Sequence, residues 1–439
     1  MTLPASWEQA QLAELGSWVG GGTPNKRVPG FWNGDIPWVS PKDMKVARIR
    51  DTQDHITQDA LAHSATTLVA AGSVLVVVRS GILRHTLPVA VTDRGAALNQ
   101  DMKALLPGAE VVPEYVAWGL RAFSQEILHS CSKSGTTVQS IDTERLLEYS
   151  IPLAPAAEQR RIVAAIEERF SRLDAAEDSL RRAQRVTSVL RSSLITASVA
   201  GDWSRRPWRE VGLSQNGRAF PSRDYSKEGI KLLRPGNLHA SGRVVWTSEN
   251  TRRLPDRYEH EFPAYVVGPN ELVMNLTAQS LRDEFLGRVC LTNPGDHCLL
   301  NQRIARLIPN EADTNYLLLV FKSRPFRRFV ESLNKGSLIQ HMFTSQLAEF
   351  EIPLPPLEDQ RRIVAEVERQ LSLVDALSTA IDAALRRSRA LRRSILERAF
   401  TGKLVPQDPS DEPAPVLLKR IANDRVSSDK PARRRKTRA

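Results

Sequence analysis

Three closely spaced side chains have the chemistry to bind a metal ion: Cys290, His297 and Cys298. Thiolate and imidazole groups are the ligands that zinc prefers, and a structural zinc site uses four of them at characteristic spacing. No fourth ligand follows at such a spacing, so we expect no metal site. The one other cysteine is Cys131, and so small and odd a number favours a reducing compartment over a disulfide framework.

The motifs of common catalytic chemistries are also missing from the sequence. It contains no G-x-x-x-x-G-K-[ST] phosphate loop, no G-x-G-x-x-G dinucleotide turn and no H-E-x-x-H zinc helix. The glycine run at 20–22 continues into Thr23 and Pro24, which is typical of a turn. Asn293-Pro294-Gly295 is a turn signal without the N-P-P-[YF] pattern of an adenine methyltransferase. We therefore expect a chain that is not an enzyme and binds no cofactor.

The charge of the chain favours a polyanionic partner. Sixty-one Lys and Arg residues outnumber 50 Asp and Glu residues, giving a net charge of +11 and a pI near 9.8. Part of the surplus lies in residues 431–439, and we expect a polar basic tail over 403–439. No secretion signal is visible, and the apolar run at 73–78 is too short to span a bilayer, so we expect a cytoplasmic protein.

The strongest internal pattern is a repeat. The segment IPLAPAAEQRRIVAAIEERFSRLDA begins at Ile151, and IPLPPLEDQRRIVAEVERQLSLVDA begins 201 residues later at Ile352. The same offset relates Gln139 to Gln340 upstream. The chain is therefore two tandem halves, each a divergent segment followed by a similar one.

The two similar segments predict long helices. After a proline-rich entry, neither contains proline or an internal glycine before Gly201 and Gly402, and apolar residues recur at heptad spacing. Small and polar residues interrupt the pattern at 183–187 and 384–388. Matched length and register favour packing of the two helices against each other; the alternative is two amphipathic helices on separate domains.

The divergent segments predict mixed α and β structure. Residues 73–80, 272–277 and 288–292 have strand-like patterns, whereas 115–123 and 316–330 are helical in pattern. The fold class is therefore α+β, with two tandem globular α/β domains, each followed by a long helix. The expected boundaries are 1–150 for the first domain, 151–201 for a central helix, 202–351 for the second domain, 352–402 for a C-terminal helix, and 403–439 for the tail.

Several segments carry a resemblance to a known family. Leu3 to Met44, with LGSWVGGGTPNKRVPGFWNGDIPWVSPKDM, resembles the start of a target recognition domain in the specificity subunits of type I restriction-modification enzymes. The two repeated helix entries resemble the spacers of that family, and the segment from Ser394 resembles its carboxy end. The second divergent segment departs somewhat, because 203–238 lacks the Gly-Gly-Thr-Pro turn.

The resemblance implies a division of labour within a larger complex. Each divergent domain would read one half of a bipartite site on double-stranded DNA, and the two helices would form an antiparallel coiled coil. Two modification subunits would bind S-adenosylmethionine and methylate adenine at N6. Restriction subunits would add an ATP- and Mg-dependent translocase and nuclease. Because the two domains differ in sequence, we expect an asymmetric target.

DNA contacts are expected from polar and basic side chains in loops beside the predicted strands. Some of these positions recur in both halves, so framework roles are the alternative. The candidates are Arg79, Ser80, Arg84, Lys133, Thr136, Thr137 and Gln139 in the first half, and Arg234, Asn237, Asn275, Gln279, Arg282, Lys335, Ser337 and Gln340 in the second.

Exposed arginines on the helix entries are candidates for docking modification subunits, although a solvated helix face is the simpler interpretation. They are Arg160, Arg161, Arg361 and Arg362. Two other functions stay open at this point. One is a coiled-coil scaffold that recognises a protein partner, and the other is an unrecognised enzyme such as a self-contained modifying nuclease.

Overall fold

The computed structural model describes residues 3–133, 138–279, 284–333 and 340–428. The chain divides into two compact units: unit 1 is Met1–Asp178 with Leu385–Ala439, and unit 2 is Ser179–Ala384. The unit borders fall inside two helices of 43 residues each, α5 (Ala156–Ser198) and α11 (Leu357–Ala399). Each unit therefore contains one globular domain and a part of both long helices.

Unit 1 holds two main sheets. One has the strand order β2-β10-β7-β8-β4, the other β5-β3-β9-β6, and β1 pairs with β11 in a separate ribbon. The elements are β1 (Glu8–Gln11), β2 (Gly16–Gly20), η1 (Pro29–Phe31), β3 (Trp32–Val39), β4 (Arg48–Ile49), β5 (Asp54–Ile56), α1 (Gln58–Ala62), β6 (Leu68–Val69), β7 (Val74–Val77), η2 (Gly81–Arg84), β8 (Val89–Thr92), β9 (Ala96–Leu98), β10 (Met102–Pro107), α2 (Pro113–Ala122), α3 (Ser124–Cys131), α4 (Thr143–Glu148), β11 (Ser150–Leu153) and α12 (Ala414–Ser428).

Unit 2 repeats this plan. Its sheets have the orders β13-β21-β17-β19 and β15-β14-β20-β16, and β12 pairs with β23. The elements are β12 (Arg205–Pro207), α6 (Trp208–Val211), β13 (Gly212–Asn216), η3 (Ser222–Asp224), β14 (Ile230–Leu233), η4 (Pro235–Asn237), β15 (Arg252–Leu254), α7 (Arg257–Glu261), η5 (Pro263–Tyr265), β16 (Val266–Val267), β17 (Leu272–Asn275), β18 (Thr277–Ala278), β19 (Val289–Leu291), β20 (Cys298–Leu300), β21 (Ile304–Pro309), α8 (Thr314–Lys322), α9 (Arg324–Leu333), β22 (Gln340–His341), α10 (Thr344–Leu347) and β23 (Glu351–Pro353).

The structure confirms most of the local predictions. Strands β7, β17 and β19 lie within the three segments predicted as strands, and α2 covers most of the first predicted helix. The second predicted helix is broken at Ser323 into α8 and α9, because Pro325 occupies the first turn of α9 and has no N–H to continue the helix.

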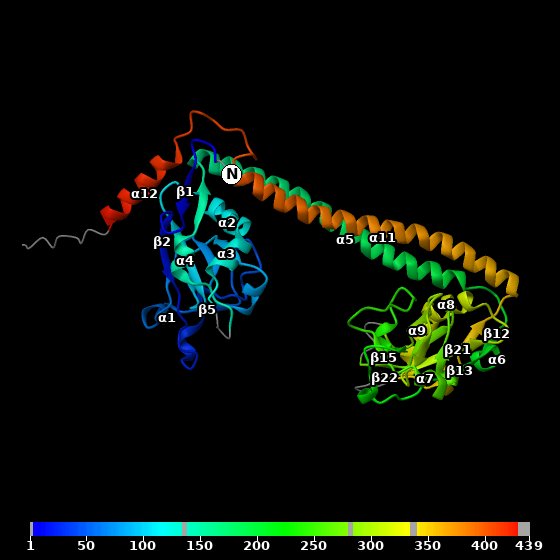
Figure 1. Cartoon of the computed structure of the whole chain (residues 1–439). Coiled ribbons are helices and arrows are strands. Elements are labelled where there is room, and N and C mark those ends of the chain that lie inside the picture. Colours follow the sequence, from blue (N-terminus) through cyan, green and yellow to red (C-terminus); the bar gives the residue numbers. More distant parts are fainter. Residues whose placement is uncertain (1–2, 134–137, 280–283, 334–339, 429–439) are drawn as a thin grey trace, which may run out of the picture. The chain divides into compact units, whose positions relative to one another are not determined.

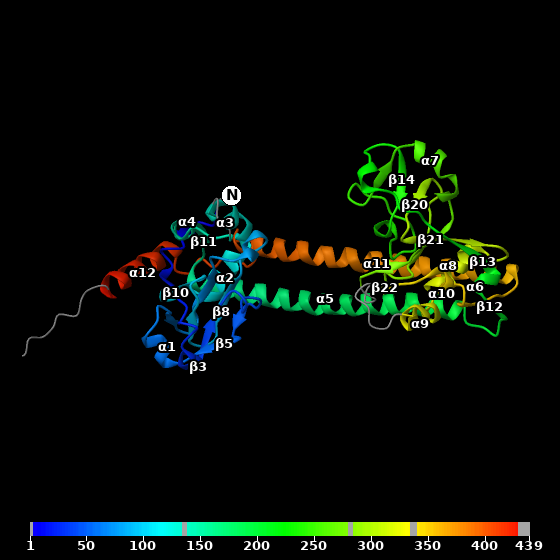
Figure 2. The same cartoon turned by 90° about the horizontal axis from the view of Figure 1, so that it is seen from below.

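Helices α5 and α11 run side by side and antiparallel (Figures 1 and 2). In unit 1, Asp174 bonds to Arg392, and Glu177 bonds to Ser388. In unit 2, Gln184 bonds to Asp382 and Arg191 to Asp375. In both units, later residues of α5 bond to earlier residues of α11, as in an antiparallel pair. The predicted coiled coil is therefore present, and polar Thr187 and Ser388 are buried where the heptad pattern weakened.

The repeated helix entry is anchored by a buried glutamine. The Gln159 side chain accepts a hydrogen bond from the backbone N–H of Val112 (2.9 Å) and donates to the carbonyl of Ala154 (2.8 Å). Gln360 makes the same two bonds in unit 2, to Asp313 and Pro355. The amide therefore ties the start of each long helix to the loop before a domain helix, α2 or α8.

The C-terminal segment differs from the polar tail expected after residue 402. Helix α12 lies in unit 1, and its Ala414, Leu417 and Ile421 belong to the hydrophobic core there, together with Leu404. Arg161 on α5 also forms an ion pair with Asp411 (2.6 Å). The expectation missed this because the apolar residues are few and are separated by charged ones. Residues 429–439, which include the whole basic run at 431–439, lie outside the described part.

Candidate nucleic-acid interface

The candidates of the first half meet where the end of β7 approaches the segment after α3. Backbone bridges join Arg79 to Ser140 and Ser132 to Ile141. The N–H of Ser80 donates to the carbonyl of Gln139 (3.0 Å). Arg79, Ser80 and Ser140 thus line one open pocket with Pro41, Gly81, Asp101 and Val138.

Charge at this pocket is partly compensated. Arg79 is 55% exposed in its side chain and forms an ion pair with Asp101 (2.6 Å), a partner that the sequence analysis did not single out. The Ser80 hydroxyl accepts from Ile82 and caps η2, which ends at exposed Arg84. Lys133 is exposed, and Gln139 is half-buried. Thr136 and Thr137 lie outside the described residues.

In unit 2 the corresponding two segments pair in the same way, with other side chains. Thr277 and Ala278 of β18 pair with His341 and Gln340 of β22, in the place of Arg79 and Ser140. Gln340 corresponds to Gln139, as the repeat predicted, and neighbouring Gln279 is exposed. The candidates Arg282, Lys335 and Ser337 lie outside the described residues.

Two asparagine candidates are buried and hydrogen-bonded to the backbone. Asn275 is 0% exposed, and its amide donates to the carbonyls of Thr277 (2.8 Å) and Phe285 (2.9 Å). Asn237 is 1% exposed and accepts from the backbone N–H of Arg234 (2.9 Å). Asp43 makes the matching bond to the N–H of Ser40 in unit 1. These side chains are buried and hydrogen-bonded to the backbone, so in this structure they hold loops, and their assignment as base readers stays a prediction.

Arg234 is accessible and stacks on an aromatic ring. Its guanidinium carbon lies 5.8 Å from the ring centroid of Tyr225. Beside it the structure places Arg218, which the sequence analysis missed, with its guanidinium carbon 4.1 Å from the centroid of Phe262. The short β-bridge that positions Arg218 joins it to Asn301, far away in the sequence, so no local pattern indicated this role.

The four docking candidates are not equivalent. Arg161 is held by Asp411, so its charge is already paired within the chain. Its repeat counterpart Arg362 pairs with Asp359 on its own helix (2.6 Å) and lines an open pocket. Arg160 and Arg361 are exposed on α5 and α11. The repeat therefore presents different surfaces at corresponding helix entries.

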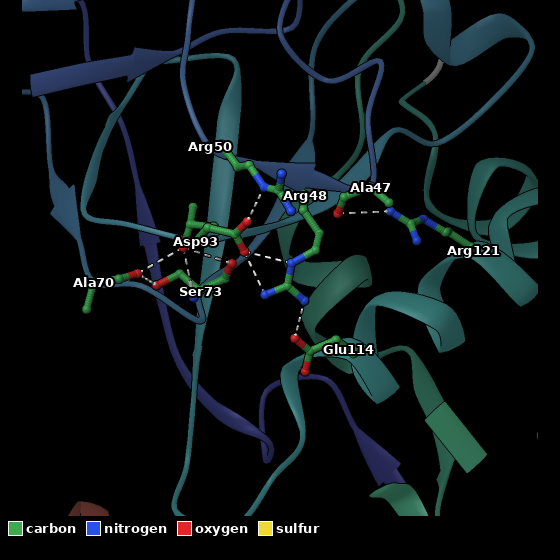
Figure 3. Close-up of polar contacts among 9 residues, drawn as sticks. Ala47, Arg48, Arg50, Ala70, Ser73, Asp93, Glu114 and Arg121 are labelled. Carbon is green, nitrogen blue, oxygen red and sulfur yellow. Dashed lines mark hydrogen bonds and ion pairs between the residues drawn. The ribbon is translucent and has the colours of Figure 1, made fainter. Parts of the chain in front are cut away.

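Another charged cluster in unit 1 supports the sheet. Arg48 forms ion pairs with Asp93 (2.6 Å) and Glu114 (2.7 Å), and Arg50 also reaches Asp93 (Figure 3). These arginines hold the pKa of the Asp93 carboxyl below its usual value, mainly through the hydrogen bond from Arg48. Arg121 donates to the carbonyl of Val89 (2.5 Å), and burial lowers its pKa to about 10. The partners are internal, so the cluster fixes β4, β8 and α2.

The three possible metal ligands of the sequence lie in different settings. Cys290 is on β19 and Cys298 on β20, and burial raises the pKa of both thiols to about 12. His297 contacts Glu259 (2.7 Å). Among the described residues, no group of three His, Cys, Asp or Glu side chains is arranged to hold a metal. None of the described helices is long and apolar enough to cross a membrane.

The fold defines a class of two-domain proteins in which similar sheet domains are each followed by one helix of an antiparallel pair. A sequence profile described as the type I restriction modification DNA specificity domain matches residues 4–181 and 276–386. The chain belongs to this family.

Individual relatives agree with this assignment. The chain is 42% identical over 161 residues to the EcoR124I/EcoR124II specificity subunit of Escherichia coli, which covers 36% of this chain and 40% of that relative. It is 22% identical over 338 residues to the EcoBI specificity subunit of Escherichia coli, covering 68% and 69%. The stronger match therefore spans less than half of the relative's length.

Solved structures share the fold. A chain from a study of complex assembly and conformational transition of the type I R-M system covers 92% of this chain and all of its own, at 21% identity and a TM-score of 0.74. The HsdS subunit from Thermoanaerobacter tengcongensis matches at 20% identity and a TM-score of 0.55, covering 92% and 98%. At these identities the likeness shows the fold alone.

Proposed function

We propose that this chain is the DNA sequence-specificity subunit of a type I restriction-modification complex. One observation carries the proposal: two domains share one backbone frame and present different side chains at matching loop ends. In unit 1 Arg79 bridges to Ser140 and forms an ion pair with Asp101, whereas in unit 2 the matching position carries Thr277, which pairs with His341. A common frame with unlike surfaces suits two unlike half-sites, so the target is bipartite and asymmetric.

The division of recognition follows from the chemistry of DNA. Basic side chains contact phosphates and supply affinity that falls with salt, whereas a few polar side chains read base edges in the major groove. Candidates at accessible corners are Arg79, Ser80, Arg84, Lys133 and Gln139 in unit 1, and Arg234, Gln279 and Gln340 in unit 2. The chain itself would catalyse nothing and would work in the cytoplasm.

The partners would be two modification subunits and restriction subunits. S-adenosylmethionine would bind to the modification subunits, and ATP and Mg to the restriction subunits. Support for a subunit that docks on the long helices comes from unit 2. There, Leu194 and Ala197 of α5 and Ile363 and Val367 of α11 line an open pocket. Polar Ser198, Arg362, Glu366 and Gln370 complete its lining, and exposed Leu190 and Leu377 lie on the same two helices.

The test is to co-express this chain with a modification subunit in cells that lack adenine methylation, and to map N6-methyladenine by long-read sequencing. One interrupted, asymmetric motif supports the proposal. Cells with the modification subunit alone are the control. Binding of a protein partner without any DNA motif would instead favour the scaffold function.

A further inference from the structure

Arg218 and Arg234 flank one short turn of unit 2. The N–H of Arg218 donates to the carbonyl of Leu300 (2.9 Å), and its carbonyl accepts from the N–H of Gln302 (2.9 Å). On the other side, the N–H of Asn301 donates to the carbonyl of Leu233, next to Arg234 (3.1 Å). Arg218 is therefore held by backbone bonds at the end of β20, and Arg234 directly follows a residue that is held there.

Both guanidiniums also rest on aromatic rings. Phe262, under Arg218, packs against Phe220 (5.8 Å between centroids) and Tyr258 (5.7 Å). The Tyr258 hydroxyl donates to Asp224 (2.5 Å), which fixes the platform further. A cation–π contact attracts a guanidinium to the ring without using its N–H donors. The arrangement orders a flexible side chain without consuming its hydrogen-bonding capacity.

No carboxylate neutralises these two arginines within the described part of the chain. This distinguishes them from Arg79, which pairs with Asp101, and from Arg306, which pairs with Glu271 (2.6 Å). Two guanidinium groups beside one turn, neither of them paired with a carboxylate in the described part of the chain, suit a ligand that presents hydrogen-bond acceptors.

The same backbone positions in unit 1 carry small residues. Gly22 donates to the carbonyl of Leu98 (2.8 Å) as Arg218 does to Leu300, so Gly22 is the counterpart of Arg218. Asn99 donates to the carbonyl of Val39 (2.9 Å), which makes Ser40 the counterpart of Arg234. The arginine pair is therefore a feature of unit 2 alone and is not part of the shared frame.

We propose that Arg218 and Arg234 are specificity-determining residues that each read a guanine in the half-site bound by unit 2. The inference rests on the proposed function. Guanine presents two acceptors, N7 and O6, on its major-groove edge, and a guanidinium fork matches both. Unit 1, with glycine and serine at these positions, would read its half-site without this pair.

The experiment uses the complex of the full chain with its modification subunit and maps the methylated motif. The variants are Arg218→Ala, Arg234→Ala and the charge-preserving Arg218→Lys and Arg234→Lys. The matched control is Arg257→Ala, because Arg257 also stacks on a ring, that of Tyr258, but pairs with Glu261 (3.5 Å) and lies on α7. Thermal melting of each complex reports whether it stays folded.

We expect each alanine variant to relax one G·C position, both within the same half-site, with preference for guanine falling on the order of tenfold or more. The lysine variants relax the same positions, since lysine lacks the planar fork, and the control keeps the full motif. An unchanged motif with uniformly weaker, more salt-sensitive methylation would show phosphate contacts and overturn the inference, as would relaxation in different half-sites. If the unaltered chain directs no motif, the proposed function fails as well.

Discussion

Arg392 on α11 forms an ion pair with Asp174 on α5 (2.5 Å), and the repeat forms the same pair again between Arg191 and Asp375. Each residue is separated from its counterpart by 201 positions, the offset of the sequence repeat. The surroundings differ, because Arg392 also reaches Glu177 (3.2 Å) and lies over the ring of Phe170 (5.0 Å).

The two pairs should therefore differ in strength. Replacing Arg392 by alanine removes two ion pairs, one of them to half-buried Glu177, and we expect a loss of about 1–3 kcal/mol in the free energy of unfolding. Arg191→Ala removes a more exposed pair and should cost less than about 1 kcal/mol. Chemical denaturation of the full chain measures both, and the exposed neighbour Arg393→Ala is the control. Equal losses for Arg392 and Arg191 would contradict the argument.

The buried glutamines of the helix entries should matter similarly in both units. Gln159→Ala and Gln360→Ala each leave a backbone N–H without its acceptor, at a cost of about 1–3 kcal/mol. Gln9→Ala, on the exposed face of β1, serves as the control. Thermal melting that is unaffected by either core substitution would show that water replaces the amide.

These elements show what the sequence could predict. The helix pair was predictable because its apolar residues, such as Ile166 and Val367, recur in one register and are buried. Leu190 and Leu391 share that spacing, but their exposure was not predictable. Buried Thr187 and Ser388 take the neighbouring positions in the packed surface.

The interface was less predictable than the frame. Arg79 and Gln139 were both singled out as candidates, and the structure brings their segments together through the bridge from Arg79 to Ser140 and the bond from Ser80 to Gln139. Arg218 was missed because a backbone bridge to Asn301 places it, and pairing over that distance leaves no local signal. Asn275 follows a strand as a base reader would, but its neighbours bury it.

Glu158 gives a pH-dependent prediction. Burial raises the pKa of its carboxyl, although hydrogen bonds from Trp7 (2.9 Å) and Gln407 (2.6 Å) and the charge of Arg161 oppose the shift, and Asp411 adds to it. A raised native pKa means that the charged form destabilises the folded state at neutral pH. This cost disappears as pH falls through the native pKa to below the value of 4.5 expected for the unfolded chain.

Glu158→Gln should therefore stabilise the protein at pH 7, because the amide keeps an acceptor for Trp7 without a buried charge. The gain over the unaltered chain should shrink toward zero below about pH 4, where the carboxyl is protonated in both states. Melting curves across this range test the sign; a gain that grows in acid would refute it. Exposed Glu168→Gln, on the same helix, is the control substitution.

Helix α12 should stabilise unit 1. Leu417 and Ile421 are 1% exposed, and Ile421 packs so closely on Gly108 that an added Cβ there would lie 2.7 Å from it. Leu417→Ala should cost about 2–5 kcal/mol through lost burial and the cavity left behind. Exposed Lys419→Ala, on the same helix, should leave the unfolding free energy nearly unchanged. No destabilisation by Leu417→Ala would contradict this role.

The pocket of unit 2 should be required for docking a modification subunit. Ala197 is exposed among the lining residues, so Ala197→Glu adds a larger, negatively charged side chain to the pocket without disturbing a buried side chain. Desolvating an unpaired carboxylate at an interface is costly, so affinity for the modification subunit should fall at least about tenfold while melting of the free chain stays the same. The matched control is Ala164→Glu, which makes the same substitution at an exposed position of α5 in unit 1. If calorimetric titration gives the same affinity for Ala197→Glu as for the unaltered chain, the subunit binds elsewhere on the helices.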